Sequence, residues 1–170
     1  MHFIHPTAVV EEGAVLGDGV KVWHFAQVRA GARIGAGTQM GKSCYVDAGV
    51  VIAERCKIQN FVSVYAGVTL EDEVFVGPSV VFTNDLYPRA TGAWEILPTL
   101  VRRGASLGAN CTLVCGVEVG EYSMVAAGSV VTKSCSDFEL VAGVPARRIG
   151  YVCRCGRPVP GRTLTCNHRT

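Results

Sequence analysis

The sequence lacks several features that would place it in the large classes of binding and membrane proteins. Its 16 basic and 14 acidic residues give a formal net charge of only +2, and no basic run precedes the C-terminal tail. Nucleic acid and anionic membranes are therefore not indicated as partners. Residues 1–6 contain no basic region followed by an apolar run, and no apolar stretch approaches the roughly 18 residues of a membrane span. We therefore expect neither a signal peptide nor a membrane segment.

What the sequence does contain is a repeat of six residues. Every sixth residue from Ile4 to Phe82 is aliphatic or similar, and a small or β-branched residue follows four positions after each. The second series is Ala8, Ala14, Val20, Ala26, Ala32, Thr38, Cys44, Val50, Cys56, Val62, Val68, Val74 and Val80. A period of six fits neither a helix, with 3.6 residues per turn, nor a meander with turns of variable length. It is typical of a short strand and a sharp turn that repeat.

Three such blocks close a triangular coil of 18 residues, so the sequence predicts an all-β fold, a parallel β-helix. A β-sandwich is the alternative, but sandwiches do not keep strand and turn lengths constant. Glycines between the repeat positions are expected to supply the positive φ angles of the corners. They are Gly13, Gly17, Gly19, Gly31, Gly35, Gly37, Gly41, Gly49, Gly67 and Gly77.

The repeat also predicts how the chain is divided. Residues 1–135 form the β-helix, but the register breaks at Thr83 and returns at Val101. Residues 83–100 are therefore expected to leave the β-helix as an excursion loop, which is either functional or a tolerated insertion. We expect the strands to end within residues 132–138 and residues 136–150 to form a short C-terminal cap, which the open end of a repeat protein needs. Residues 151–170 form a polar, basic and irregular tail.

The eight cysteines do not suggest a disulfide framework. Cys44, Cys56, Cys111 and Cys135 occupy the repeat position that elsewhere holds alanine or valine, so we interpret them as small core residues with reduced thiols. Reduced thiols indicate the cytoplasm. In the tail, four soft ligands offer a structural zinc site: Cys153, Cys155, Cys166 and His168. Their Cys-x-Cys and Cys-x-His spacings are tighter than usual for zinc, so a disordered tail without metal is the expectation and zinc is the alternative.

Several segments resemble a known family. The repeat, the loop segment 82–89 (Phe-Thr-Asn-Asp-Leu-Tyr-Pro-Arg), Trp94, the run 130–133 and the segment 143–148 are similar to hexapeptide-repeat acyltransferases of the left-handed β-helix superfamily. The left hand of the coil is implied by this resemblance alone, since the general rule for crossovers favours a right-handed coil. The nearest members are bacterial enzymes that acetylate the 3-amino group of UDP-2-acetamido-3-amino-2,3-dideoxy-glucuronate for the O-antigen of lipopolysaccharide. Enzymes that act on dTDP-3-amino-6-deoxyhexoses share the Asn-Asp-x-x-Pro loop and are the alternative.

The resemblance implies a homotrimer that binds acetyl-CoA between neighbouring β-helices and takes a UDP-amino sugar as its second substrate. It implies that Asn84 holds the sugar amine against the thioester and that Asp85 accepts a hydrogen bond from the amine or positions the loop. Asn84 is otherwise a turn-forming residue, and Asp85 otherwise pairs with Arg89. Substrate-binding candidates are His24, Arg29, Lys42 and Arg89, of which the sequence selects none for a uronate carboxylate. Cofactor-binding candidates are the backbone at Gly104, Ala109 and Ala127 and the cations Lys133 and Arg148, which are otherwise solvated.

The scarcity of histidine is an independent argument about the reaction. The four histidines are His2, His5, His24 and His168, and none lies in the excursion loop or the later coils. His24 is expected more than three coils below Asn84, roughly 15 Å along the axis, so it is a substrate contact or a turn residue. A hydroxyl acceptor needs a general base, whereas a neutral amine is already nucleophilic and needs mainly orientation. The sequence therefore favours N-acetylation.

Two other readings of the same fold are weaker. A γ-type carbonic anhydrase binds zinc through three histidines at a subunit boundary, and the coils do not contain them. A non-catalytic β-helix that serves as a scaffold would be marked by loss of the loop motif or of the segment that binds CoA. Neither is missing, so an N-acetyltransferase is the expected function.

Overall fold

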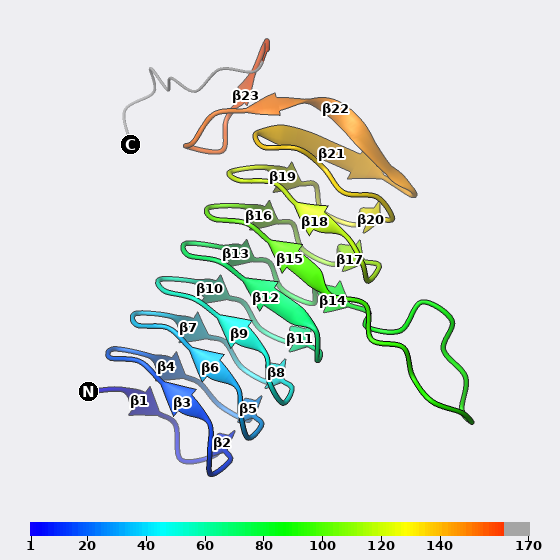
Figure 1. Ribbon diagram of the computed structural model, residues 1–170. Coiled ribbons are helices and arrows are strands. Elements are labelled where there is room, and N and C mark those ends of the chain that lie inside the picture. Colours follow the sequence, from blue (N-terminus) through cyan, green and yellow to red (C-terminus); the bar gives the residue numbers. More distant parts are fainter. Residues whose placement is uncertain (162–170) are drawn as a thin grey trace.

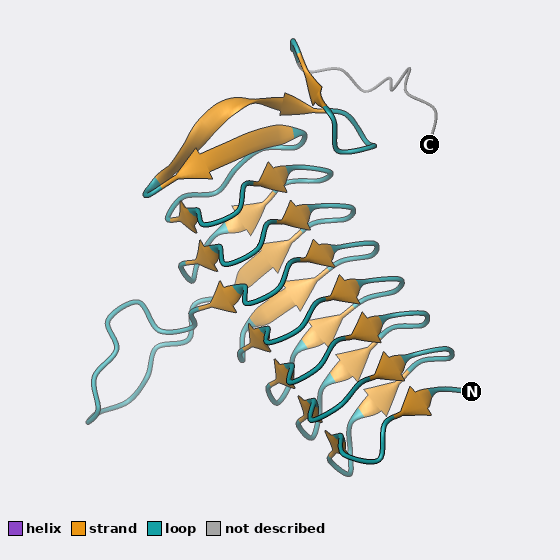
Figure 2. Cartoon of the chain, turned by 180° about the vertical axis from the view of Figure 1, so that it is seen from behind, coloured by secondary structure: helices purple, strands orange, loops and turns teal. Residues whose placement is uncertain are grey.

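The computed structural model describes residues 1–161, and these form a triangular β-helix with one loop and a C-terminal hairpin (Figures 1 and 2). No helix occurs among the described residues, and hence none that is long and apolar enough to cross a membrane. The all-β, parallel β-helix expected from the repeat is confirmed. The fold is consistent with the left-handed form that the resemblance implies.

Each coil contributes one short parallel strand to each of the three faces of the prism, except that the last coil, with β19 and β20, adds no strand to the third face. The first face contains β1 (Phe3–Ile4), β4 (Lys21–Val22), β7 (Gln39–Met40), β10 (Lys57–Ile58), β13 (Phe75–Val76), β16 (Ser106–Leu107) and β19 (Met124–Val125). The second face contains β2 (Val9–Val10), β5 (Gln27–Val28), β8 (Tyr45–Val46), β11 (Ser63–Val64), β14 (Val81–Phe82), β17 (Thr112–Leu113) and β20 (Val130–Val131). The third face contains β3 (Val15–Leu16), β6 (Arg33–Ile34), β9 (Val51–Ile52), β12 (Val68–Leu70), β15 (Thr99–Val101) and β18 (Glu118–Val119).

We number the coils by their first-face strand, from the first coil at β1 to the seventh at β19. The first corner joins the first face to the second, the second corner joins the second to the third, and the third corner joins the third to the first. Strand pairing keeps a constant register, for example Lys57↔Phe75 and Ile58↔Val76, so that residues of successive coils stack in columns along the axis. A residue's column and coil therefore give its position in the molecule.

The predicted inward positions form one continuous core. From Val20 to Val131 both repeat series are buried, including Thr38, Cys44 and Cys56. Thr38 is accommodated because its hydroxyl donates to the carbonyl of Ala53 at 2.8 Å. The first coil is the exception, since Ile4 is 39% exposed at the open N-terminal end of the prism, where no coil lies below it.

The glycines have two separate roles, of which the sequence predicts one. Gly13, Gly19, Gly31, Gly37, Gly49 and Gly67 have positive φ as expected, but Gly17, Gly35, Gly41 and Gly77 do not. An added Cβ at Gly35 would lie 2.5 Å from the carbonyl carbon of Ala53 in the next coil. These four glycines are therefore required by close backbone approach between coils, and the prediction of positive φ was wrong for them.

The C-terminal part of the fold differs from the prediction. The strands do not end within residues 132–138, because β21 (Glu139–Gly143) continues the first face in parallel with β19, and β22 (Ala146–Val152) and β23 (Pro158–Val159) follow antiparallel. This hairpin closes the C-terminal end of the prism (Figure 1). It extends past residue 150, and Val152 and Cys153 are buried. The irregular tail thus cannot begin at residue 151.

Candidate active site at the second corner

The excursion loop leaves the second corner through a narrow neck after β14. The backbone N–H of Thr83 still donates to the carbonyl of Leu113 in the next coil at 3.0 Å, and its hydroxyl accepts from the N–H of Cys115 at 2.9 Å. The carbonyl of Asn84 then accepts from the N–H of Leu97 at 3.0 Å. Asp85 and Ile96 form an antiparallel bridge. The two ends of the loop are thus tied to each other and to the coil above.

Glycines in the adjacent coils make room for this neck. Gly67, directly below it, has a φ of +91°, and a Cβ there would lie 2.6 Å from the side chain of Ile96. Gly116 lies above, where an added Cβ would contact Leu97 at 3.6 Å. The chain rejoins the β-helix at Thr99, two residues before Val101, where the repeat was expected to resume, because Thr99 takes the inward position of Val68.

The side chains of Asn84 and Asp85 differ in what they do within the chain. Asp85 accepts the N–H of Tyr87 on Oδ1 at 3.0 Å, so it organises the start of the loop. Arg89 is exposed and donates to the carbonyl of Pro88, and no ion pair joins it to Asp85 among residues 1–161. The half-buried amide of Asn84 makes no hydrogen bond with any described side chain or backbone group. Its amide oxygen and N–H groups are therefore available to a ligand.

The second corner also carries one of the predicted cofactor cations. The register of β14, β17 and β20 stacks Cys115 above Asn84 and Lys133 above Cys115. Lys133 is exposed and lies two coils above Asn84, about 10 Å along the axis. Arg29 stands at the same corner three coils below Thr83, since Arg29, Asp47, Tyr65 and Thr83 stack in one column. A line of polar side chains thus runs along this edge of the prism.

A cationic hollow forms where this edge meets the C-terminal hairpin. Lys133, Arg147 and Arg148 line it together with Glu139 and Ala146, so the structure brings the two predicted cations to one place. Arg148 is already engaged, because it donates to the Tyr151 hydroxyl at 2.9 Å and to Glu139 at 3.3 Å. Arg147 was not selected by sequence reasoning. Its guanidinium contacts only the carbonyl of Ala146 in the described chain, which leaves most of its donors to an anionic group.

The three backbone candidates do not lie together. Ala109 and Ala127 share the first corner in the sixth and seventh coils, where Gly128 N–H donates to the Ala109 carbonyl. Gly104 lies at the third corner and is covered by the ring of Tyr122, which an added Cβ would meet at 2.4 Å. Gly104 is therefore separated from the other two by a whole face.

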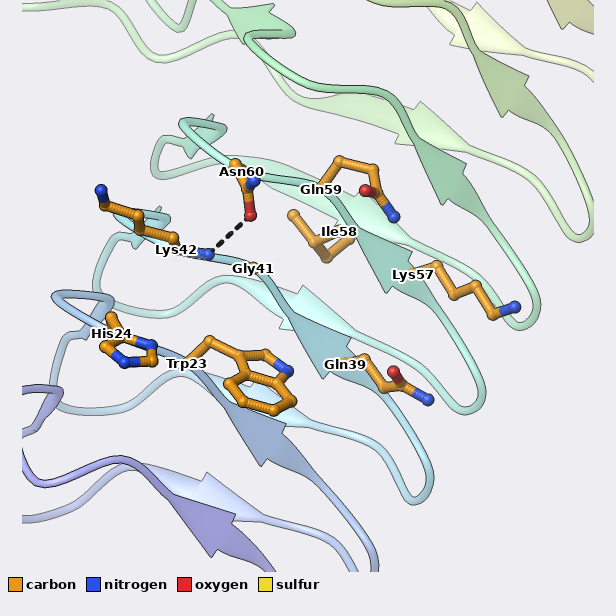
Figure 3. A pocket seen from close by; sticks show the side chains of 9 residues that line it. All are labelled: Trp23, His24, Gln39, Gly41, Lys42, Lys57, Ile58, Gln59 and Asn60. Carbon is orange, nitrogen blue, oxygen red and sulfur yellow. Dashed lines mark hydrogen bonds between the residues drawn. The ribbon is translucent and has the colours of Figure 1, made fainter.

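A second hollow lies at the first corner, and it contains two predicted substrate contacts. His24 and Lys42 line it with Trp23, Gln39, Lys57, Gln59 and Asn60, from the second to the fourth coil (Figure 3). The Lys42 N–H donates to the side chain of Asn60 at 2.9 Å. No carboxylate lines this hollow, so Lys42 and Lys57 give it a positive potential suited to an anionic ligand. Sequence reasoning missed Asn60. A spacing of 18 residues identifies it, because His24, Lys42 and Asn60 stack in one column.

Arg29 is not part of this hollow. Its Nε lies 2.8 Å from Glu11 Oε1, and it donates to the hydroxyl of Tyr45, which in turn donates to Asp47. Its hydrogen bonds to Tyr45 and Glu11 raise its pKa above the ordinary value. In this arrangement the carboxylates of Glu11 and Asp47 neutralise the charge of Arg29.

His24 stands three coils below Asn84 and at a different corner, as its sequence separation predicts. It stacks on His5 with ring centroids 3.5 Å apart. Burial lowers the pKa of His5, and the charge of His24 lowers it further. No histidine of residues 1–161 lies at the loop neck.

Comparison with known proteins agrees with this architecture. A family model described as "hexapeptide repeat of succinyl-transferase" matches residues 31–66 and 103–133, on either side of the loop. The two matched segments carry the hexapeptide repeat that this family model describes. Both matched segments lie in the stacked coils, and neither includes the excursion loop.

Relatives of this hexapeptide-repeat chain include acetyltransferases. It is 56% identical over 57 residues to dTDP-3-amino-3,6-dideoxy-alpha-D-galactopyranose 3-N-acetyltransferase of Aneurinibacillus thermoaerophilus, which covers 34% of this chain and 30% of that protein. It is 36% identical over 124 residues to serine acetyltransferase 4 of Arabidopsis thaliana, covering 72% of this chain and 30% of that protein. The chain thus spans about a third of the length of these curated relatives.

Solved structures share the fold at low sequence identity. The polySia-specific acetyltransferase NeuO matches with a TM-score of 0.67 and 17% identity, over 96% of this chain and 86% of that one. A mutant of AntD, an N-acyltransferase from Bacillus cereus in complex with dTDP and coenzyme A, matches with a TM-score of 0.55 and 16% identity, over 87% and 79% of the two chains. At this identity the likeness establishes the fold alone.

Proposed function

We propose that this hexapeptide-repeat protein is an acetyl-CoA-dependent N-acetyltransferase that acts on the 3-amino group of a nucleotide-linked amino sugar. The observation that carries the proposal is the edge at the second corner. It combines a half-buried amide, Asn84, which has no partner in the described chain, with a hollow lined by three cations two coils above.

The cationic hollow fits the phosphates of coenzyme A. Lys133 and Arg147 supply donors to phosphate oxygens, and Arg148 lies beside them. With its phosphates there, the extended arm of the cofactor would run down the corner toward Asn84. When bound, acetyl-CoA supplies the activated acetyl group.

The proposed role of Asn84 is to orient the sugar amine. Its amide oxygen would accept a hydrogen bond from the sugar amine and so direct the nitrogen lone pair at the thioester carbonyl. The amine attacks, the carbon–sulfur bond breaks, and the amine proton leaves with the thiolate or with water. Asp85 acts through the loop, because its carboxylate is used by the Tyr87 N–H.

The first-corner hollow supports an anionic sugar nucleotide as the second substrate. Lys42, Lys57 and His24 could bind a diphosphate or a uronate carboxylate, and the finer proposal is UDP-2-acetamido-3-amino-2,3-dideoxy-glucuronate. This hollow and Asn84 lie at different corners, so one ligand reaches both only across a boundary between subunits. The proposal therefore includes a homotrimer. The local similarity to an enzyme named for 3-N-acetylation of a dTDP-amino sugar supports the reaction class.

The decisive assay measures release of the CoA thiol from acetyl-CoA with three acceptors. They are the UDP-amino uronate, its 3-hydroxyl counterpart and a dTDP-3-amino-6-deoxyhexose. Turnover with the UDP-amino uronate alone supports both the reaction and the substrate, and turnover with the dTDP sugar alone moves the assignment to that nucleotide. Release with the 3-hydroxyl compound alone, or with none of the three, contradicts the proposal.

Asn84→Ala tests the role of the amide directly. Loss of one orienting group at a reacting centre lowers kcat by about 100-fold or more, with little change in unfolding. Thr91→Ala, an exposed change in the same loop, is the matched control and should keep full activity. An Asn84→Ala enzyme within twofold of the parent would exclude Asn84 from the chemistry.

A further inference from the structure

The two ends of the prism are finished differently. At the C-terminal end the hairpin of β21 and β22 covers the last coil, whose inward residues Val125 and Val131 are 0% and 1% exposed. No segment of the described chain crosses the N-terminal end (Figures 1 and 2). There β1, β2 and β3 are each the last strand of a sheet, so three strand edges lie open.

The cysteines beside the hairpin do not make a second interaction site in the described chain. The Sγ atoms of Cys153 and Cys155 lie 2.9 Å apart, but the other two predicted zinc ligands, Cys166 and His168, lie outside the described residues. No group of three histidine, cysteine or acidic residues that could hold a metal occurs among residues 1–161. The open N-terminal end is the better-defined surface.

The first coil is apolar on its outside as well as its inside. Its outward residues Phe3, Val9 and Val15 are 43%, 55% and 58% exposed. The residues that stack on them in the second coil are polar, namely Lys21, Gln27 and Arg33. The terminal repeat of a solenoid ordinarily has a polar outer surface, because this keeps the protein soluble. An apolar terminal coil with open strand edges is therefore suited to a partner.

The charges at this end narrow the kind of partner. The amino group of Met1 lies 2.9 Å from Asp18, and Glu11 lies 2.8 Å from Arg29, so these groups are matched within the chain. Glu12 is the one acidic residue of the first coil without a salt bridge in the described chain. The coil contains no lysine or arginine, so nucleic acid and anionic membranes find no complementary charge. A fitting partner supplies apolar side chains and strand edges.

A second copy of the same end meets these requirements. All strands of one face run parallel, so rotation by 180° about an axis perpendicular to the prism, through the middle of one face, reverses their direction. Each open edge then faces an antiparallel edge of the copy, and such edges pair through their N–H and C=O groups. The two triangular ends match in size because they are identical.

We propose that two copies of this protein associate end to end through their N-terminal coils. The contact is isologous and closes at two copies, because the hairpin blocks the same kind of pairing at the other end of the prism. The apolar outward residues of the two first coils then lie beside one another. The proposal does not rest on the transferase reaction or on the trimer, and it applies equally to an end of one chain and to the joint end of a trimer.

Light scattering during size-exclusion chromatography tests the proposal on the full chain, over a concentration series. We expect the parent to have twice the molar mass of Val15→Lys, because a charge at an open strand edge opposes pairing. Val51→Lys is the matched control and should keep the parent's mass, since Val51 lies in the same outward column two coils above and is 39% exposed. Val9→Lys, at the edge of β2, should act as Val15→Lys does and replaces it if that variant folds poorly.

Small-angle X-ray scattering distinguishes an end-to-end pair from a side-by-side pair. The longest dimension of the parent should be nearly twice that of Val15→Lys, while the circular dichroism of the two proteins agrees. The proposal fails if the parent and Val15→Lys have the same molar mass or the same longest dimension. It also fails if Val15→Lys lowers the mass by a factor other than two, or if Val51→Lys halves the mass as well.

Discussion

The interior of the β-helix and the neck of its loop are neighbours in the molecule but are held by different kinds of contact. Ile58 lies inside the fourth coil, buried between identical positions above and below, at Met40 and Val76. Asn84 lies at the edge of the fifth coil, fixed by hydrogen bonds that occur once in the chain. The first kind of position needs a residue of the right size, and the second needs a particular residue. Stability should therefore depend on the interior and turnover on the neck.

The largest expected effect is the difference in the free energy of unfolding between variants at Ile58 and at Asn84. Ile58→Ala removes buried methyl groups from a column that cannot collapse, because stacked strands hold it open, and should lower the free energy of unfolding by about 2–5 kcal/mol. Asn84→Ala should change it by less than about 0.5 kcal/mol, since the side chain has no partner in the described chain. Denaturant titration of both variants measures the contrast. A strongly destabilised Asn84→Ala would mean that the amide supports the fold.

A smaller effect distinguishes the two roles of glycine within the regular coils. Gly35→Ala places a Cβ 2.5 Å from the backbone of Ala53 and should cost up to about 3 kcal/mol, because stacked backbones cannot separate. Gly49→Ala meets nothing within 4 Å and carries only the cost of positive φ, about 1 kcal/mol. Thermal unfolding of the two variants gives the comparison. Equal losses of stability in the two variants would mean that the neighbouring coils move apart at Gly35 to accommodate the added methyl group.

The interior was predictable because it repeats, and the exceptions show the limit of that signal. Thr99 was assigned to the loop because the repeat pattern was recognised again only from Val101, yet it is buried at the position of Val68. The strands β21, β22 and β23 were missed because an antiparallel hairpin has no six-residue period. Asn84 was recognised by its motif, whereas Arg147 and Lys57 were missed. Outward positions of a β-helix are free to vary, so a periodic pattern does not select among them.

The buried thiols provide a pH-dependent test of the interior. Burial raises the pKa of Cys44 to about 11 and that of Cys111 to about 12. Such a thiol stays neutral in the fold but ionises in the unfolded chain above its ordinary pKa of about 8.5, so stability present below that pH is lost as pH rises toward the folded value. Each thiol contributes a slope of about 1.4 kcal/mol per pH unit. Cys111→Ala should reduce the slope measured between pH 9 and 10 by that amount.

Cys155→Ser is the control for this slope, because it changes a half-buried thiol outside the β-helix. An unchanged slope in Cys111→Ala would mean that the thiol is not held neutral by the core.

The smallest expected effect tests whether the neck is held independently of the coils. Asp85→Ala removes the hydrogen bond to Tyr87 N–H, a contact worth about 1 kcal/mol, and should raise local opening of the loop about fivefold. Limited proteolysis within residues 86–95 should accelerate by that factor, while global unfolding is unchanged. Glu95→Ala, an exposed change in the same loop, should leave the cleavage rate as it is. If Asp85→Ala instead lowers global stability as much as Gly49→Ala does, the loop and the coils unfold as one unit and the contrast between them is lost.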